Sequence, residues 1–167
     1  MSAGNVPASA YPRRIAMPPD IRRIAPGESK EYDAAAQLIA ATFAQCVAHS
    51  MDARGIETFL AYAAAPALRA RDAAGCATYV AYDGGALVGV LHVRDGEHIS
   101  LFFVRPDRHG QGIGHALIER ADRTTRLASV NSSTNAVRSY ERYGFKASGP
   151  EQVSDGIRFV PMRRAAA

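Results

Sequence analysis

Apolar residues in the first half of the chain recur with a helical period. In residues 31–46 they return every three or four positions, which predicts an amphipathic helix. A second helical pattern covers residues 56–65 and is expected to stop at Pro66, because a proline ring disfavours helical geometry in the preceding residue. Ahead of both helices, residues 21–24 predict a short strand in which two isoleucines flank two arginines.

The pattern then changes to the alternation of strands. Residues 77–82 and 86–93, joined by an Asp-Gly-Gly turn, predict a β-hairpin. An Asp-Gly turn leads into residues 98–104, HISLFFV, which are apolar on both faces. Such a strand is typical of the centre of a sheet with helices on each side.

A glycine-rich loop, RPDRHGQGIG, follows this third run and leads into a helix with an apolar face over residues 113–121. Residues 127–130, 135–143 and 157–162 then predict a strand, a short helix and a last strand. The order of elements predicts an α/β (α+β) fold with a mixed central β-sheet of six to seven strands and helices on both faces.

The length of 167 residues suits one domain, which we expect to span residues 20–164. Residues 1–19 contain four prolines and no hydrophobic period, so we expect a flexible leader. No apolar run reaches the roughly 20 residues of a membrane span, and a secretory signal is not recognisable. These features favour the cytoplasm and no membrane partner, and Cys46 and Cys76 are expected to be reduced thiols.

The net charge of +4 comes from arginines scattered along the chain, without the dense basic runs or interleaved aromatic residues of nucleic-acid surfaces. Nucleic acid is therefore not an expected partner. A phosphorylated ligand and a basic surface without function both remain open. The five histidines and two cysteines never occur at the spacing of metal ligands, so no metal is predicted.

Three glycines, Gly110, Gly112 and Gly114, lie between the predicted central strand and the following helix. Free backbone N–H groups and the helix dipole make such a position an anion site. A Walker A loop is excluded because the stretch has no lysine, and a dinucleotide fingerprint fails because His115 or Leu117 stands at its last glycine. A glycine turn without any ligand remains the alternative.

Two segments resemble a known family. VRPDRHGQGIGHALIERA resembles motif A of the GNAT family of acyl-CoA N-acyltransferases, with its Q/R-x-x-G-x-G/A core at residues 109–114. His109 stands where the family usually has Gln or Arg. VNSSTNAVRSYERYGF resembles the family's motif B, whose characteristic positions are Ala136, Tyr140, Glu141, Gly144 and Phe145. The resemblance covers residues 21–162 and implies a GNAT-type fold.

The resemblance further implies an N-acetyltransferase that binds acetyl-CoA as co-substrate through backbone N–H groups of the loop. The strand before the loop is expected to splay from the next one and to present N–H groups to the thioester carbonyl. The candidate cofactor-binding residues are Phe102, Phe103, Val104, Arg108, His109, Gly110, Gln111, Gly112, Ile113, Gly114, Asn131, Asn135 and Tyr140.

Amide formation from a thioester requires a neutral amine and a proton for the departing thiolate. By resemblance Tyr140 supplies that proton, although Ala136, Tyr140 and Tyr143 also recur like a packed helix face. Of the two tyrosines, Tyr143 is the stronger candidate for a core residue. His98 and Glu97 are the candidate bases, because several family members carry a catalytic group on this strand. Alternation places His98 on one face with Ser100 and Phe102, directed at the acceptor cleft. A solvated residue at the strand end is the alternative.

The preceding strand carries His92, which we interpret as a partly buried, hydrogen-bonded residue. Residues 32–71 are expected to line the amine pocket, with Phe59 or Tyr62 in contact with the acceptor. The acceptor is expected to be a primary amine of a small molecule or a protein. Homodimers are common in the family, so a second copy is a candidate partner. The competing hypothesis is a catalytically silent acyl-CoA sensor or partner-binding module on the same fold.

Overall fold

A mixed β-sheet forms the centre of the molecule, whose computed structural model describes residues 17–165. The predicted leader, residues 1–19, lies mostly outside the described residues, so the domain limits of 20–164 stay a prediction. The eight strands within the described range are β1 (Asp20–Arg23), β2 (Ala77–Asp83), β3 (Ala86–Arg94), β4 (His98–Val104), β5 (Ser129–Ser132), β6 (Phe145–Ala147), β7 (Gln152–Ser154) and β8 (Ile157–Arg164).

The strands lie in the order β1-β2-β3-β4-β5-β8-β6, and β7 pairs with β8 alone. The β4–β5 pair is parallel and the other pairs are antiparallel. This arrangement confirms the predicted mixed sheet and the central place of β4. The prediction of six to seven strands falls short by the three-residue strands β6 and β7, which are too short to show a clear alternation.

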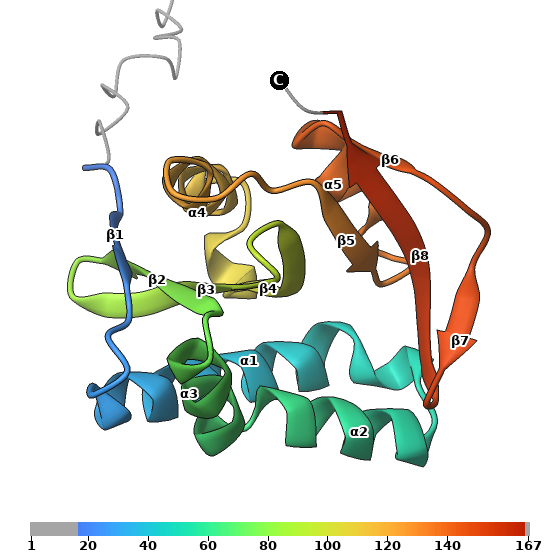
Figure 1. Cartoon of the computed structure of the whole chain (residues 1–167), viewed down its shortest axis with the longest axis horizontal. Coiled ribbons are helices and arrows are strands. Elements are labelled where there is room, and N and C mark those ends of the chain that lie inside the picture. The colour runs from blue at the N-terminus through green and yellow to red at the C-terminus, as the bar shows by residue number, and fades with distance from the viewer. Residues whose placement is uncertain (1–16, 166–167) are drawn as a thin grey trace, which may run out of the picture.

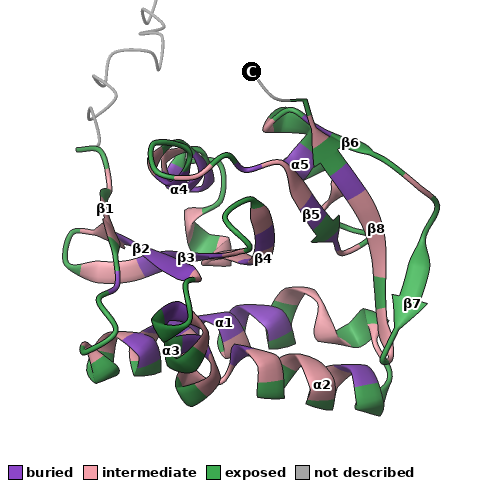
Figure 2. Cartoon of the chain, viewed as in Figure 1, coloured by how far each residue is buried: buried purple, intermediate pink, exposed green. Residues whose placement is uncertain are grey.

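Helices cover both faces of the sheet (Figure 1). They are α1 (Ser29–Cys46), α2 (Ala53–Ala63), α3 (Ala65–Ala73), α4 (Ile113–Asp122) and α5 (Val137–Arg142), with short 3-10 turns η1 (Ala48–Ser50) and η2 (Pro106–Arg108). The buried residues lie where α1 and α3 meet one face of the sheet and α4 the other (Figure 2). Within residues 17–165, no helix is long and apolar enough to cross a membrane.

The helix break expected at Pro66 lies two residues earlier. Helix α2 ends at Ala63, Ala64 adopts an extended conformation, and Pro66 stands in the first turn of α3. Proline fits there because the first turn has no intrahelical partner for its N–H and because its fixed φ suits a helix. The sequence prediction was therefore wrong in treating this proline as a stop, and it missed α3.

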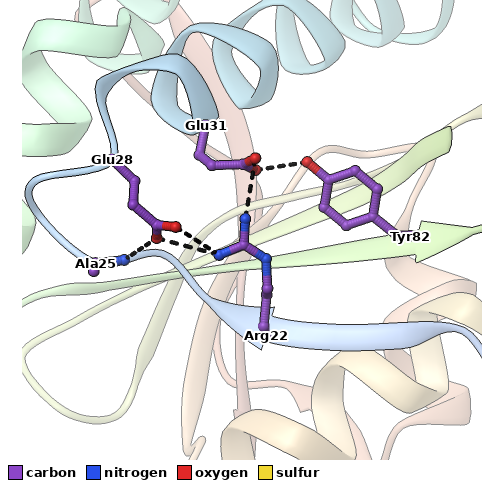
Figure 3. A network of polar contacts seen from close by, with 5 residues as sticks. All are labelled: Arg22, Ala25, Glu28, Glu31 and Tyr82. Atoms are coloured by element: carbon purple, nitrogen blue, oxygen red, sulfur yellow. Dashed lines mark hydrogen bonds and ion pairs between the residues drawn. The ribbon is translucent and has the colours of Figure 1, made fainter. Parts of the chain in front are cut away.

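A polar network fastens the start of α1 to the first two strands (Figure 3). Arg22 of β1 lies 3.0 Å from both Glu28 and Glu31, and Glu28 also accepts the Ala25 N–H at 2.8 Å. Tyr82 of β2 donates to Glu31 at 2.6 Å, and burial together with this bond raises the pKa of Tyr82, so its hydroxyl stays a donor. The network fixes where α1 begins on the sheet.

At the opposite end of the helical layer, the β7–β8 turn rests on the first turn of α2 (Figure 1). Asp155 and Gly156 form this turn with φ values of 51° and 77°. Asp52 caps α2 by accepting the Gly55 N–H at 2.7 Å. A Cβ atom at Gly55 would collide with the carbonyl group of Gly156, so the contact requires two bare backbones.

The contact with Gly156 requires glycine at position 55, although this position lies within a helix. Alanine normally stabilises a helix by about 1 kcal/mol relative to glycine. Gly55→Ala should instead destabilise the protein by about 1–3 kcal/mol, the usual cost of overpacking, measured by urea denaturation. Gly27→Ala is the control, because a Cβ there meets no atom within 4 Å and its backbone needs no left-handed conformation. A Gly55→Ala protein more stable than wild type would contradict the contact.

Candidate active site

The central sheet opens between β4 and β5. These strands pair only at His98 with Ser129 and at Ile99 with Val130, and beyond those two pairs they separate. A cavity of about 1240 Å³ lies along the separated part of β4 and extends to the glycine loop, α2, α5 and the β7–β8 hairpin. Single small-ligand pockets usually measure about 300–1000 Å³. The cavity therefore has room for a large ligand and a second reactant.

The glycine loop forms one end of this cavity. Gly110 and Gly112 have φ values of 75° and 83°, and a Cβ atom on either would meet no protein atom within 4 Å. Gly112 is the N-cap of the ten-residue helix α4, whose first N–H groups and dipole favour an anion. The loop thus offers open space, bare backbone and a positive field. The pyrophosphate of an acyl-CoA fits these properties.

Two side chains of the loop hold it in place. Arg108 bonds Asp83 of β2 at 2.6 Å, and the His109 ring nitrogen Nε2 lies 2.7 Å from the carbonyl oxygen of Val104. His109 thus replaces the family's usual Gln or Arg with a contact to the end of β4. Both residues line the cavity.

Gly114 has a different role from the other two glycines. It lies inside α4 and is buried, and a Cβ atom there would strike the Tyr143 hydroxyl and approach the Phe102 ring to 3.1 Å. The third glycine therefore lets α5 pack against α4. Spacing within the motif could not reveal this contact, because Tyr143 lies 29 residues further along the chain.

Tyr140 of α5 lines the cavity with only 7% of its surface exposed. Its ring packs against Phe102 and Phe145, with ring centres 5.9 Å apart in each pair. Burial raises the pKa of the Tyr140 phenol, and neighbouring Tyr143 raises it further, so the group stays protonated at neutral pH. It can therefore donate a hydrogen bond into the cavity. Tyr143 is half-buried, packs against the core and also lines the cavity.

The two candidate bases occupy different environments. His98 is half-buried, lines the cavity, and has Nδ1 2.8 Å from the Ser129 hydroxyl. Burial and the nearby Arg94 cation lower the pKa of His98 to about 4, so its imidazole holds a proton weakly. Glu97 is exposed in the turn before β4 and does not belong to the cavity wall.

A bulge in β4 changes which side chains share a face. His92 of β3 pairs with Leu101, but the next residue, Val93, pairs with Ile99, so Ser100 is left as the extra residue. The predicted alternation of Ser100 with Phe102 on one face is therefore wrong. Ile99 and Leu101 are buried in the apolar clusters on opposite faces of the sheet, as expected for a strand covered on both sides.

Because of the bulge, Ser100 and Phe102 point to opposite faces of the sheet. Phe102 packs into the core beneath α4. Ser100 hydrogen-bonds His92, whose ring lies edge-on to Tyr62 of α2. His92 is hydrogen-bonded, as expected from the sequence, but it is fully buried rather than partly buried.

The predicted acceptor residues form the wall opposite the loop. Phe59 stacks on Phe43 with ring centres 3.9 Å apart and meets Phe103 edge-on, while Arg71 lies over the Tyr62 ring at 3.7 Å. Phe59, Tyr62 and Arg71 all line the cavity. Their contact with an acceptor stays a prediction.

The two candidate asparagines lie in β5 and in the segment that follows it. Asn131 is exposed at the cavity, and Asn135 donates to the Cys46 carbonyl at 2.9 Å, which ties this segment to the end of α1. Cys46 and Cys76 are both free thiols, as expected.

The sequence analysis missed the wall formed by the β7–β8 hairpin. The cavity-lining residues of this hairpin are Ser154, Asp155, Ile157, Arg158 and Phe159. The Asp-Gly pair at 155–156 is a strong hairpin signal and could have predicted the two strands that it joins. Their position over α2 depends on tertiary contact and had no local signal.

One cavity therefore joins a glycine loop with free backbone N–H groups, the end of a splayed central strand and a protonated tyrosine. The family pattern of the Acetyltransferase (GNAT) domain matches residues 47–166. The chain belongs to the GNAT acetyltransferase family.

Relatives and solved structures agree with this membership. The peptidyl-lysine N-acetyltransferase YjaB of Salmonella typhimurium is 42% identical over 65 residues, which are 36% of this chain and 43% of that protein. The match thus spans less than half the length of the curated relative. A GCN5-related N-acetyltransferase from Rhodopseudomonas palustris has a TM-score of 0.69 at 20% identity, covering 92% of this chain and 99% of that one.

A third similar protein is the PaiA N-acetyltransferase from Thermoplasma acidophilum, whose crystal structure is a complex with coenzyme A. Its TM-score is 0.60 at 16% identity, and the alignment covers 89% of this chain and all of that one, 100%. Likeness at this identity establishes a shared fold.

Replacing Gly112 with aspartate tests the loop directly. The new side chain would occupy the open space beside the backbone and add a negative charge where the phosphates are expected. Isothermal calorimetry should show that coenzyme A binding is lost. Gly75→Asp is the matched control, since it also has a left-handed backbone and open surroundings but lies outside the cavity. Wild-type affinity in a folded Gly112→Asp protein would disprove the loop assignment.

Proposed function

We propose that the protein is an N-acetyltransferase that passes the acetyl group of acetyl-CoA to a primary amine by direct attack on the thioester. The observation that carries this proposal is the single cavity that joins the glycine loop, the separated edge of β4, Tyr140 and the aromatic wall of α2. Family membership supports it, and so does the coenzyme A bound to the PaiA relative.

Each end of the cavity suits one reactant. Backbone N–H groups of residues 109–114 hold the pyrophosphate, and N–H groups of residues 102–104 face the thioester carbonyl, where negative charge develops. Tyr140 donates a hydrogen bond to the departing thiolate. The amine approaches from the side of Phe59 and Tyr62. Because both reactants share one cavity, no acyl-enzyme intermediate is required.

The acceptor is an amine of a small molecule or of a protein. The relative YjaB acts on peptidyl-lysine, which supports a protein acceptor, and the match to it spans less than half of that protein. Purified protein should release free coenzyme A thiol from acetyl-CoA when mixed with the right member of a panel of small amines and lysine peptides. Binding of acetyl-CoA without turnover of any amine would favour a catalytically silent sensor.

The role of Tyr140 can be separated from its packing. Tyr140→Phe keeps the ring against Phe102 and Phe145 and removes only the hydroxyl proton. We expect kcat to fall about 100-fold, the lower end of the usual range for a positioned acid, because a thiol with a pKa near 8.5 leaves fairly well unaided. Affinity for coenzyme A should stay unchanged.

Tyr143→Phe is the comparison for that variant, because it removes a neighbouring hydroxyl from the same cavity. Its effect on kcat should be much smaller. Full turnover of Tyr140→Phe would show that Tyr140 has only a packing role. A larger loss of kcat in Tyr143→Phe than in Tyr140→Phe would identify Tyr143 as the proton donor instead.

The acceptor wall makes a separate prediction. Phe59→Ala removes an aromatic contact on the amine side, so the KM for the amine should rise about 10-fold, equivalent to roughly 1.4 kcal/mol. The KM for acetyl-CoA should hardly change in steady-state kinetics. Leu60→Ala, one residue further along α2, is exposed and outside the cavity and serves as the control. Loss of acetyl-CoA affinity with normal amine kinetics would contradict this division of the cavity.

A further inference from the structure

A chain of polar groups runs from the buried side of the sheet to the cavity. Asp72 of α3 and His92 of β3 are 5% and 0% exposed, which is rare for ionisable residues. The His92 ring nitrogen Nδ1 is hydrogen-bonded to the Ser100 hydroxyl. Ser100 is only half-buried and lines the cavity together with Tyr140. The order Asp72, His92, Ser100 therefore leads from the core to the reactants.

The geometry decides which nitrogen of His92 carries the proton. Asp72 Oδ1 and His92 Nε2 lie 3.4 Å apart, and each is buried without another hydrogen-bond partner within the described chain. An ionised carboxylate can only accept, so the proton belongs on Nε2. Nδ1 is then the acceptor, and the Ser100 hydroxyl donates to it. The same orientation of a histidine by a buried carboxylate activates serine hydroxyls in unrelated enzymes.

The surroundings keep Asp72 ionised. Its Oδ2 accepts the Tyr32 hydroxyl at 2.8 Å and the Thr78 N–H at 3.0 Å. Burial alone would raise the pKa of Asp72, but the hydrogen bonds from His92, Tyr32 and Thr78 outweigh burial and hold that pKa below its usual value. The carboxylate beside Nε2 thus holds the His92 ring in a fixed orientation.

The bulge in β4 gives Ser100 its position. As the extra residue, Ser100 contacts His92 on the side of α2 and α3 while it stays open to the cavity. The ionisable residues nearest His92 are Asp72 of α3, Tyr62 of α2 and, beyond Asp72, Tyr32 of α1. Arg71 lies over the Tyr62 ring at 3.7 Å. Asp72 is thus the charged group in direct contact with His92.

We propose that Ser100 is the group that takes the proton from the amine, with His92 and Asp72 as positioning residues that act through it. This assignment rests on the proposed acetyl transfer. The amine nitrogen forms a bond to the acetyl carbon, and the bond from that carbon to sulfur breaks. The amine proton passes to Ser100 Oγ while the hydroxyl proton of Ser100 passes to His92 Nδ1. The thiolate takes its proton from Tyr140.

After product release, His92 returns its proton through Ser100 to solvent, and solvent restores the Tyr140 proton, so the enzyme is regenerated. The relay explains why a histidine and an aspartate are kept at the centre of the sheet. His98, in contrast, lies in the same cavity with a pKa too low to hold the amine proton.

Steady-state kinetics of two Ser100 variants test the relay. Ser100→Ala should lower kcat about 100-fold and leave the KM for acetyl-CoA unchanged. Ser100→Thr keeps a hydroxyl and should restore most of the turnover. Ser129→Ala, which removes the hydroxyl next to His98, is the matched control and should stay close to wild type. Unchanged turnover in Ser100→Ala, or equal losses in both Ser100 variants, would overturn the relay.

A second measurement does not depend on turnover. ¹⁵N NMR of histidine-labelled protein should show His92 with its proton on Nε2, and the Nδ1 signal should shift in Ser100→Ala when the hydrogen bond is lost. A proton on Nδ1 in the wild-type protein would overturn the relay even if acetyl transfer is active. If no amine is acetylated while the Nε2 proton is observed, the proposed function fails instead.

Discussion

The separation of β4 from β5 is the constraint on which the rest of the structure depends. Two pairs at His98 and Ile99 hold the strands together, and beyond them no strand of residues 17–165 pairs with β4 on that side. Unpaired backbone groups inside a protein are costly unless a partner satisfies them. The glycine loop, α5 and the β7–β8 hairpin surround this opening rather than close it. The free edge of β4 therefore offers backbone hydrogen-bonding groups to the cavity.

Order around the opening is maintained by contacts on three sides. Arg108 and His109 anchor the loop, and the Phe102 ring connects β4 to both tyrosines of α5. Behind the sheet, Asp72 and His92 form a polar centre within an otherwise apolar layer. Such a centre loses more from a broken hydrogen bond than an apolar one does, because its groups have no access to water. Polar burial there is consistent with a use beyond packing.

Local patterns were sufficient for much of the fold. The stripe of α1, the first hairpin, the central strand and the loop before α4 each have a period or a turn signal that does not depend on distant residues. Pro66 was read as a helix stop, but the fixed φ of proline also suits the first turn of a helix, and here Pro66 belongs to the start of α3. The bulge at Ser100, the contact of Gly114 with Tyr143 and the pairing of Asp72 with His92 join residues from separate elements. Such tertiary contacts leave no local signal in the sequence, yet they determine much of the chemistry of the candidate site.

The bare contact between Gly55 and Gly156 has a consequence for how this protein can change over generations. Because the two backbones touch without side chains, the main chain itself sets the spacing between α2 and the hairpin at this point. Substitutions at Arg158 or Phe159, further along β8, can then change the shape of this wall of the cavity while the contact is preserved. The hairpin wall can thus diverge among descendants of this protein while the glycine-loop end of the cavity stays intact.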